Sequence, residues 1–270
     1  MSTRTKVYSA KDVIEDVRDF FINRDHWAYQ YGDPTPECNP NSPYHRKQIE
    51  VIFENRYDHW DVNNAVDSLV SQKFLRKKRS GNAHFVFRSN VRYYIREIKR
   101  RTKIIEAYSD PTITRALGNW GEKIVEYMCG LNGFEILGRN TNEFQGKRWA
   151  RTNENLDFII GKDYIAYGIE VKNTLPYMET DEFLRKIAMC RFLGLTPLWI
   201  VRNAPEVQFN TMKASRGLIL ASKVQMYPYG QEPLTKRIWN KMRLPVGVRA
   251  EMPQKVVNSL ISFHKLLISS

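Results

Sequence analysis

Cysteine is scarce in this chain of 270 residues, and long apolar runs are missing. The three cysteines, Cys38, Cys129 and Cys190, are odd in number and widely separated, which excludes a disulfide framework or a zinc cluster and favours free thiols in a reducing cytoplasm. No stretch approaches the roughly 18 consecutive apolar residues of a membrane span, and the first residues do not resemble a secretory signal. We therefore expect a cytoplasmic protein without a membrane partner.

Two further absences argue against particular types of reaction. None of the five histidines stands at metal-ligand spacing from another, which disfavours zinc-dependent hydrolysis. No glycine-rich phosphate loop of the nucleotide-triphosphatase type occurs, so the sequence does not indicate ATP use.

Positive charge is abundant and unevenly distributed. The formal net charge is +13, and residues 73–103 carry 12 Lys and Arg against the single acid Glu97. The 72 residues before this basic belt carry 8 basic and 12 acidic residues. Such a concentrated belt is typical of a phosphate-binding surface. A solvated helix without a partner is the alternative, and a membrane surface is disfavoured because the belt does not alternate with a broad apolar face.

The first 109 residues have the pattern of helices followed by a basic hairpin. Apolar spacing predicts helices over 10–23, from about residue 44, and over 61–73, with a turn-rich loop at 32–43. The helical spacing of apolar residues then ends. Two short strands are predicted from FLRKKR and AHFVFR, with a turn at Gly81 in the SGN between them. This order resembles a winged-helix DNA-binding domain, by pattern alone. A further helix over 91–108 would continue the basic belt as a linker.

The winged-helix resemblance implies where DNA would bind. In such domains the second helix of the pair, here 61–73, enters the major groove, and the hairpin lies along the backbone. The candidate groove-reading residues are Asn63, Asn64, Ser68 and Gln72, since Asn and Gln can bond an adenine edge; alternatively, they only face solvent. The candidate backbone contacts of the hairpin are Arg76, Lys77, Lys78 and Arg79.

The strongest chemical signal lies at 156–174, LDFIIGKDYIAYGIEVKNT. LDFII predicts a strand, GKD a turn and YIAYGIEVKN a second strand, so a hairpin brings Asp157 near Glu170 and Lys172. The latter two are spaced i, i+2 and project from one face of their strand. Two carboxylates at the edge of an apolar sheet are costly unless a cation neutralises them. Mg²⁺ suits such oxygen ligands and can activate water for attack on a phosphate, which an adjacent lysine can assist.

Asp157 and, thirteen positions on, Glu170-Val171-Lys172 resemble the active-site signature of the PD-(D/E)XK nuclease superfamily, with Leu156 where that signature usually has proline. The resemblance covers about 118–204. It implies an α/β (α+β) restriction-endonuclease-like core with a central mixed sheet over 110–270, following the winged-helix domain over 1–109. It also implies that the Val171 carbonyl completes the ligands of Mg²⁺, or of Mn²⁺ as a substitute. Glu122 lies where many members carry a helical glutamate that holds a water.

Basic residues near this motif are candidates for contact with DNA. The loop 145–155 opens onto the motif and carries Lys147, Arg148 and Arg151, for which backbone contact is expected. Arg185, Lys186 and Arg191 lie on the helix predicted from DEFLRKIAMCRFLG, where phosphate contact and a solvated helix face are both open. The non-catalytic alternative is that Asp157, Glu170 and Lys172 form a structural salt-bridge network.

These observations predict a Mg²⁺-dependent endodeoxyribonuclease, of the type II restriction type, acting on double-stranded DNA. A homodimer is favoured for cutting both strands, although nothing in the sequence shows one. The alternatives are a structure-specific nuclease of the Holliday-junction-resolvase type, and a non-catalytic winged-helix regulator whose nuclease fold has decayed.

Overall fold

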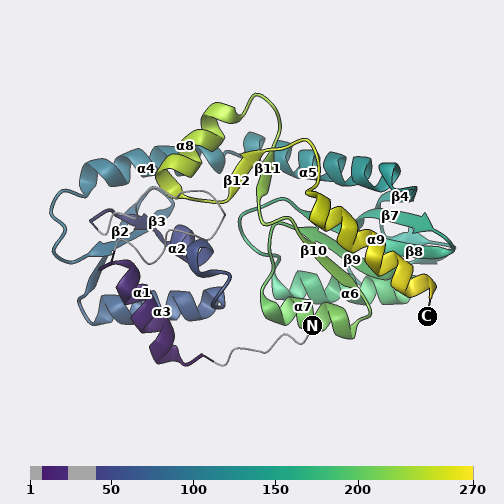
Figure 1. The fold of residues 1–270 in the computed structure, drawn as a ribbon, viewed down its shortest axis with the longest axis horizontal. Coiled ribbons are helices and arrows are strands. Elements are labelled where there is room, and N and C mark those ends of the chain that lie inside the picture. Colours follow the sequence, from purple (N-terminus) through teal and green to yellow (C-terminus); the bar gives the residue numbers. More distant parts are fainter. Residues whose placement is uncertain (1–7, 24–40, 270) are drawn as a thin grey trace. The chain divides into compact units, whose positions relative to one another are not determined.

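The computed structural model describes residues 8–23 and 41–269 of the chain (Figure 1). It is a mixed α+β structure that divides into two compact units. One comprises Met1–Ser109 and Lys236–Leu244, and the other comprises Asp110–Thr235 and Pro245–Ser270. The segment 236–244 therefore groups with the first unit, whereas the sequence analysis assigned it to the second. Cys38 and most of the predicted loop 32–43 lie outside the described residues.

The first unit is built of helices and a small antiparallel sheet. Its elements are α1 (Ala10–Phe20), β1 (Tyr44–His45), α2 (Arg46–Phe53), α3 (His59–Ser71), β2 (Leu75–Ser80), β3 (Ala83–Arg88) and α4 (Ile95–Tyr108). The strand order is β1-β3-β2. Local signals start the helices, since Ser9 forms a capping box with Asp12 at α1 and Asp58 caps α3. Gly81 takes a φ of +57° in the hairpin turn, as a two-residue hairpin loop requires.

Three helix starts in this unit differ from the prediction. The predicted helix near residue 44 starts only at Arg46, because Tyr44 and His45 pair with Val86 and Phe85 as β1. The helix α3 starts two residues earlier than expected, and α4 starts at Ile95. The core packs the apolar faces of α1, α2 and α3 against the sheet, as the predicted helical spacing requires.

The second unit is organised around a five-stranded mixed sheet with the order β10-β9-β8-β7-β4. Its elements are α5 (Pro111–Leu131), β4 (Glu135–Thr141), β5 (Glu143–Phe144), β6 (Lys147–Arg148), β7 (Leu156–Lys162), β8 (Ile165–Lys172), α6 (Thr180–Leu193), β9 (Thr196–Val201), α7 (Glu206–Ala214), β10 (Leu218–Ala221), β11 (Gln225–Tyr227), β12 (Val246–Val248) and α9 (Gln254–Ile268); α8 (Glu232–Met242) begins in this unit and ends in the first. The pairs β4–β7 and β7–β8 are antiparallel, and β8–β9 and β9–β10 are parallel.

Helices cover both faces of this sheet. One core cluster joins α5 and α9 to side chains such as Phe158 and Ile169, and the other joins α6 and α7 to side chains such as Ile159 and Trp199. Because both faces are buried, the strands are almost continuously apolar, which explains the runs LDFII and TPLWIV. The turn between β7 and β8 is made by Asp163 and Tyr164, both with positive φ, and not by the predicted GKD, because β7 extends to Lys162. Within the described residues, no helix combines the length and apolar character that a membrane crossing requires.

Candidate active site

The end of β8 and the start of β7 bring together the charged residues of the motif. Phe158 pairs with Ile169, so Asp157 comes opposite Glu170 as the strands continue. The Asp157 Oδ2 atom accepts a hydrogen bond of 2.7 Å from the Val171 N–H. The Lys172 Nζ atom lies 3.1 Å from Glu170 Oε1. The hairpin therefore places both carboxylates and the ammonium together where β7 begins and β8 ends, in the interior of the sheet.

Helix α5 brings a third carboxylate from one side of the sheet. Gly121 lies so close to β8 that a Cβ atom there would stand 2.7 Å from Asn173 Cβ and 3.4 Å from Val171 Cγ1. The buried Asn173 side chain fixes this approach, because its amide donates to the backbone oxygens of Leu117 and Met226. Glu122 follows Gly121 directly, and its charge interacts with that of Glu170.

Helix α6 contributes two charged residues to this site that the sequence analysis did not assign to it. The Glu182 Oε1 atom lies 2.8 Å from Lys172 Nζ. Lys186 forms an ion pair with Glu170 Oε2 and donates a hydrogen bond of 2.9 Å to the Asn155 carbonyl. Burial alone would lower the pKa of the Lys172 ammonium, but the carboxylates of Glu170 and Glu182 raise it above its ordinary value.

For Lys186 the alternative of a solvated helix face is wrong, because the residue is only 6% exposed. A signal was present in the sequence. Lys186 stands between Phe183, Ile187 and Cys190, which form the buried stripe of α6. A lysine within an apolar stripe needs a buried counter-charge, and Glu170 supplies it. The neighbouring Arg185 instead pairs with Glu154 at 2.7 Å.

The three carboxyl groups resist ionisation. Burial, together with the nearby charge of Asp157, raises the pKa of Glu170 to about 7. Burial also raises the pKa of Asp157, and burial and the charge of Glu170 raise that of Glu122. Ionising all three groups therefore costs free energy, and a bound cation would reduce this cost.

The donor set suits a hard divalent cation. Asp157 and Glu170 offer carboxylate oxygens, and the Val171 carbonyl points to the same side of β8 as the N–H that meets Asp157, as paired strand geometry requires. Among the described residues, no three side chains of His, Cys, Asp or Glu could hold an ion by themselves. Backbone and water oxygens would have to complete the coordination, as is usual for Mg²⁺.

The predicted groove-reading residues on α3 and at its end differ in whether their side chains are already hydrogen-bonded within the protein. The Asn63 amide is engaged within the unit, accepting from Arg46 and donating to Glu50 at 3.0 Å. Gln72 accepts from Arg18 and donates to Ser68 at 3.1 Å. Asn64 is exposed, and no hydrogen bond of its side chain is found within the described residues.

The four basic residues of the hairpin are all exposed but not equally free. Lys77 lies 2.6 Å from Asp67. Arg76 donates to the Val91 carbonyl at 2.6 Å, and Arg79 donates to the Gly81 carbonyl at 3.1 Å. Lys78 has no ion pair within the described part of the chain, so its charge is the most available to a phosphate.

The loop 145–155 is anchored by a buried tryptophan and exposes its basic residues to solvent. Trp149 is buried, and its indole N–H donates to Thr152 at 2.9 Å. Lys147, Arg148 and Arg151 are exposed around it. The predicted contact of these three cations with the DNA backbone stays a prediction; the loop leads directly into β7.

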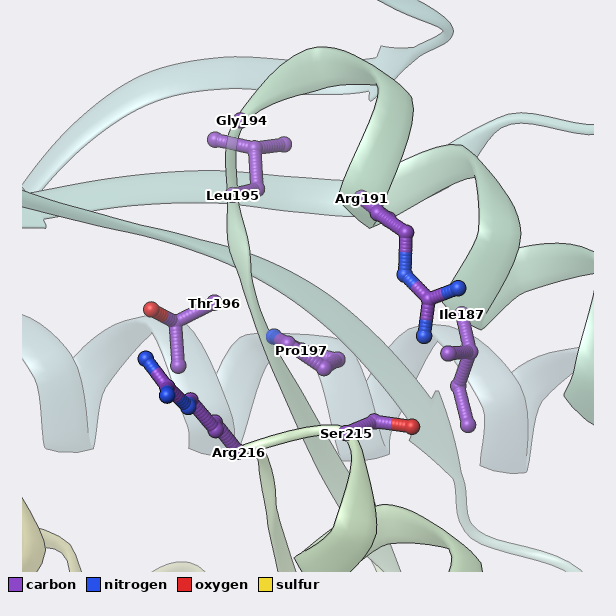
Figure 2. A pocket seen from close by; sticks show the side chains of 8 residues that line it. All are labelled: Ile187, Arg191, Gly194, Leu195, Thr196, Pro197, Ser215 and Arg216. Carbon is purple, nitrogen blue, oxygen red and sulfur yellow. The ribbon is translucent and has the colours of Figure 1, made fainter.

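A separate pocket lies at the amino end of β9. It is lined by Ile187, Arg191, Gly194, Leu195, Thr196, Pro197, Ser215 and Arg216. Figure 2 shows the side chains of Arg191 and Arg216 on either side of Pro197 in this view. Thr196 pairs with Tyr167, whereas Glu170 pairs with Trp199 further along the same strands. The pocket is therefore distinct from the carboxylate cluster, and Arg191 belongs to it.

Comparison with models of known protein families gives no match, and no curated protein matches the chain at a significant level.

Proposed function

We propose that the protein is a metal-dependent DNA endonuclease that hydrolyses phosphodiester bonds in double-stranded DNA. The observation that carries the proposal is the convergence of Asp157, Glu170 and Lys172 where β7 begins and β8 ends, with Glu122 in electrostatic contact. A structural salt-bridge network explains this less well, because the ion pairs with Lys172 and Lys186 involve Glu170, whereas neither Asp157 nor Glu122 forms an ion pair within the described residues.

Each residue has a role in hydrolysis that its position supports. Asp157, Glu170 and the Val171 carbonyl would hold Mg²⁺, with Mn²⁺ as a substitute. When bound, the ion supplies positive charge that stabilises a phosphate under attack and favours ionisation of water. Lys172, at the more exposed end of the cluster, orients the attacking water or meets the charge that develops on the phosphate. Glu122 holds a water by accepting its hydrogen bond.

The first unit supports binding to duplex DNA. Its order of helices, hairpin and strand β1 resembles that of a winged-helix domain, in which α3 would enter the major groove. However, α3 contains Asp61 and Asp67 but no Lys or Arg. Most of the backbone affinity would therefore come from the exposed cations of β2 and α4, and Asn64 is the best placed of the predicted residues to read a base.

The proposal is tested by incubating the full chain with supercoiled plasmid, linear duplex and a four-way junction, each with Mg²⁺, Mn²⁺ or EDTA. We expect metal-dependent cutting of the duplex substrates that Asp157→Ala abolishes. Cutting confined to the junction would favour a resolvase. DNA binding without cutting under any metal condition would overturn the proposal and favour a regulator with a decayed nuclease fold.

A fragment beginning at Asp110 tests the division between the units. It keeps the whole five-stranded sheet and both of its cores. It also carries 236–244, which belongs to the first unit and contains the fully buried Ile238, Met242 and Leu244. We expect the fragment to fold and bind Mg²⁺, with weak nonspecific activity, and to need polar replacements at these three positions to stay monodisperse. Retention of the full chain's cleavage pattern would place recognition in the second unit.

A further inference from the structure

Two lysines share the Glu170 carboxylate, one on each oxygen. Lys172 Nζ lies 3.1 Å from Oε1, and Lys186 Nζ pairs with Oε2. Their surroundings differ. The Lys172 side chain is 29% exposed and that of Lys186 is 7% exposed. Lys172 also has a second carboxylate partner in Glu182, at 2.8 Å.

Lys186 joins the two strands that carry the acidic residues. Besides Glu170 on β8, it donates to the carbonyl of Asn155, two residues before Asp157. Lys186 therefore links the Glu170 carboxylate to the backbone that leads into Asp157. The neighbouring Arg185 contacts Glu154 instead, in an exposed pair at the surface.

A cation that binds Glu170 is repelled by both ammonium groups, and the repulsion decreases if one of them moves away. Lys172 can withdraw from Oε1, because it is partly exposed and Glu182 remains as its partner. Lys186 is buried, and withdrawal would leave its ammonium without a carboxylate in an apolar layer. The two lysines are thus suited to different tasks.

We propose that Lys186 is a positioning residue, which holds Glu170 by Oε2 and keeps Oε1 directed at the cation while Lys172 turns to the phosphate. This inference rests on the proposed function. It assigns Lys186 no contact with DNA or with the reacting atoms; the residue acts through Glu170 and through the backbone before Asp157.

Binding of Mn²⁺ without DNA tests the inference, because the two interpretations of Lys186 predict opposite signs. If Lys186 is only a counter-charge, Lys186→Met removes a competing cation and Mn²⁺ binds more tightly. If Lys186 positions Glu170, its loss weakens Mn²⁺ binding by about 10- to 100-fold, as for other groups that orient metal ligands. Calorimetry at pH 8.5, where the carboxyl groups are ionised, separates this effect from protonation.

Arg185→Met is the matched control, since it lies beside Lys186 but contacts Glu154 and not Glu170. We expect its affinity for Mn²⁺ to stay within about twofold of the wild type, well below the change expected on loss of a ligand-orienting group. At saturating Mn²⁺, Lys186→Met should regain much of its kcat, whereas Lys172→Met should stay inactive.

If circular dichroism shows that Lys186→Met does not fold, the same Mn²⁺ binding measurement on Lys186→Arg tests the inference. Its longer, planar guanidinium cannot keep both contacts unchanged, so we expect Mn²⁺ binding weaker by at least about threefold, part of the loss that ligand-orienting groups show. Unchanged or tighter binding in the folded variant overturns the inference. If the wild type itself neither binds Mn²⁺ nor cuts DNA, the proposed function fails; if it does both and the Lys186 variants bind equally well, only the inference fails.

Discussion

Replacing Gly121 with alanine tests how closely α5 must approach β8. The added Cβ would stand 2.7 Å from Asn173 Cβ, whereas carbon atoms in favourable contact are about 3.5–4.0 Å apart. The helix or the strand end must therefore move by close to an ångström. Overpacking of this kind costs about 1–3 kcal/mol, and the better helix propensity of alanine returns about 1 kcal/mol of it. We expect a net destabilisation of up to about 2 kcal/mol.

Gly118→Ala is the matched control. Gly118 lies one turn earlier in the same helix, and a Cβ atom there would meet nothing within 4 Å. Without a clash, alanine should stabilise the protein by about 0.5–1 kcal/mol. Urea unfolding of both variants, followed by far-UV circular dichroism, measures the difference. Equal stability of the two variants would refute the close packing of α5 on β8.

The same substitution has a functional consequence under the proposed mechanism. Glu122 follows Gly121, so a displaced α5 moves this carboxylate relative to Glu170. A misplacement of about 1 Å can cost about 100-fold in rate. We expect Gly121→Ala to cut DNA much more slowly than Gly118→Ala under conditions in which both are folded.

Three further predictions concern charge. Asp157→Ala or Glu170→Ala should abolish cleavage and leave DNA binding largely intact, measured by nicking and gel-shift assays in parallel; cutting at the wild-type rate would show that the assignment is wrong. Because burial and the charge of Asp157 raise the pKa of Glu170 to about 7, protons compete with the cation below that pH, so affinity for Mn²⁺ should increase as the pH rises through 7; a flat profile between pH 6 and 8 would contradict this. Lys78→Ser should reduce the salt dependence of duplex binding by about 0.9 in the log–log slope, and Lys77→Ser by less, because Asp67 already neutralises Lys77; equal slopes would contradict that difference.

Much of the fold could be predicted because its signals are local. Capping residues, apolar spacing and the SGN turn lie within the segments that they define, and they located α1, α3 and the β2–β3 hairpin to within a few residues. Strand β1 was missed, because two residues that pair with Phe85 and Val86 some forty positions away leave no periodic signal. The grouping of the segment 236–244 with the first unit was not predicted for the same reason, since its neighbours are distant in the sequence.

The sequence by itself determined that Asp157, Glu170 and Lys172 converge, because a single hairpin joins them and the strand period of two places Glu170 and Lys172 on one side. Only the tertiary structure decided what surrounds them. Glu122 and Lys186 arrive on helices that pack on opposite faces of the sheet, and such packing depends on the shapes of side chains distant in sequence. The same holds for Asn63. The sequence shows a polar residue on a predicted helix, whereas in the fold its side-chain amide accepts a hydrogen bond from Arg46 and donates one to Glu50. Spacing along the chain specifies what a residue can do, and packing selects which of those contacts it makes.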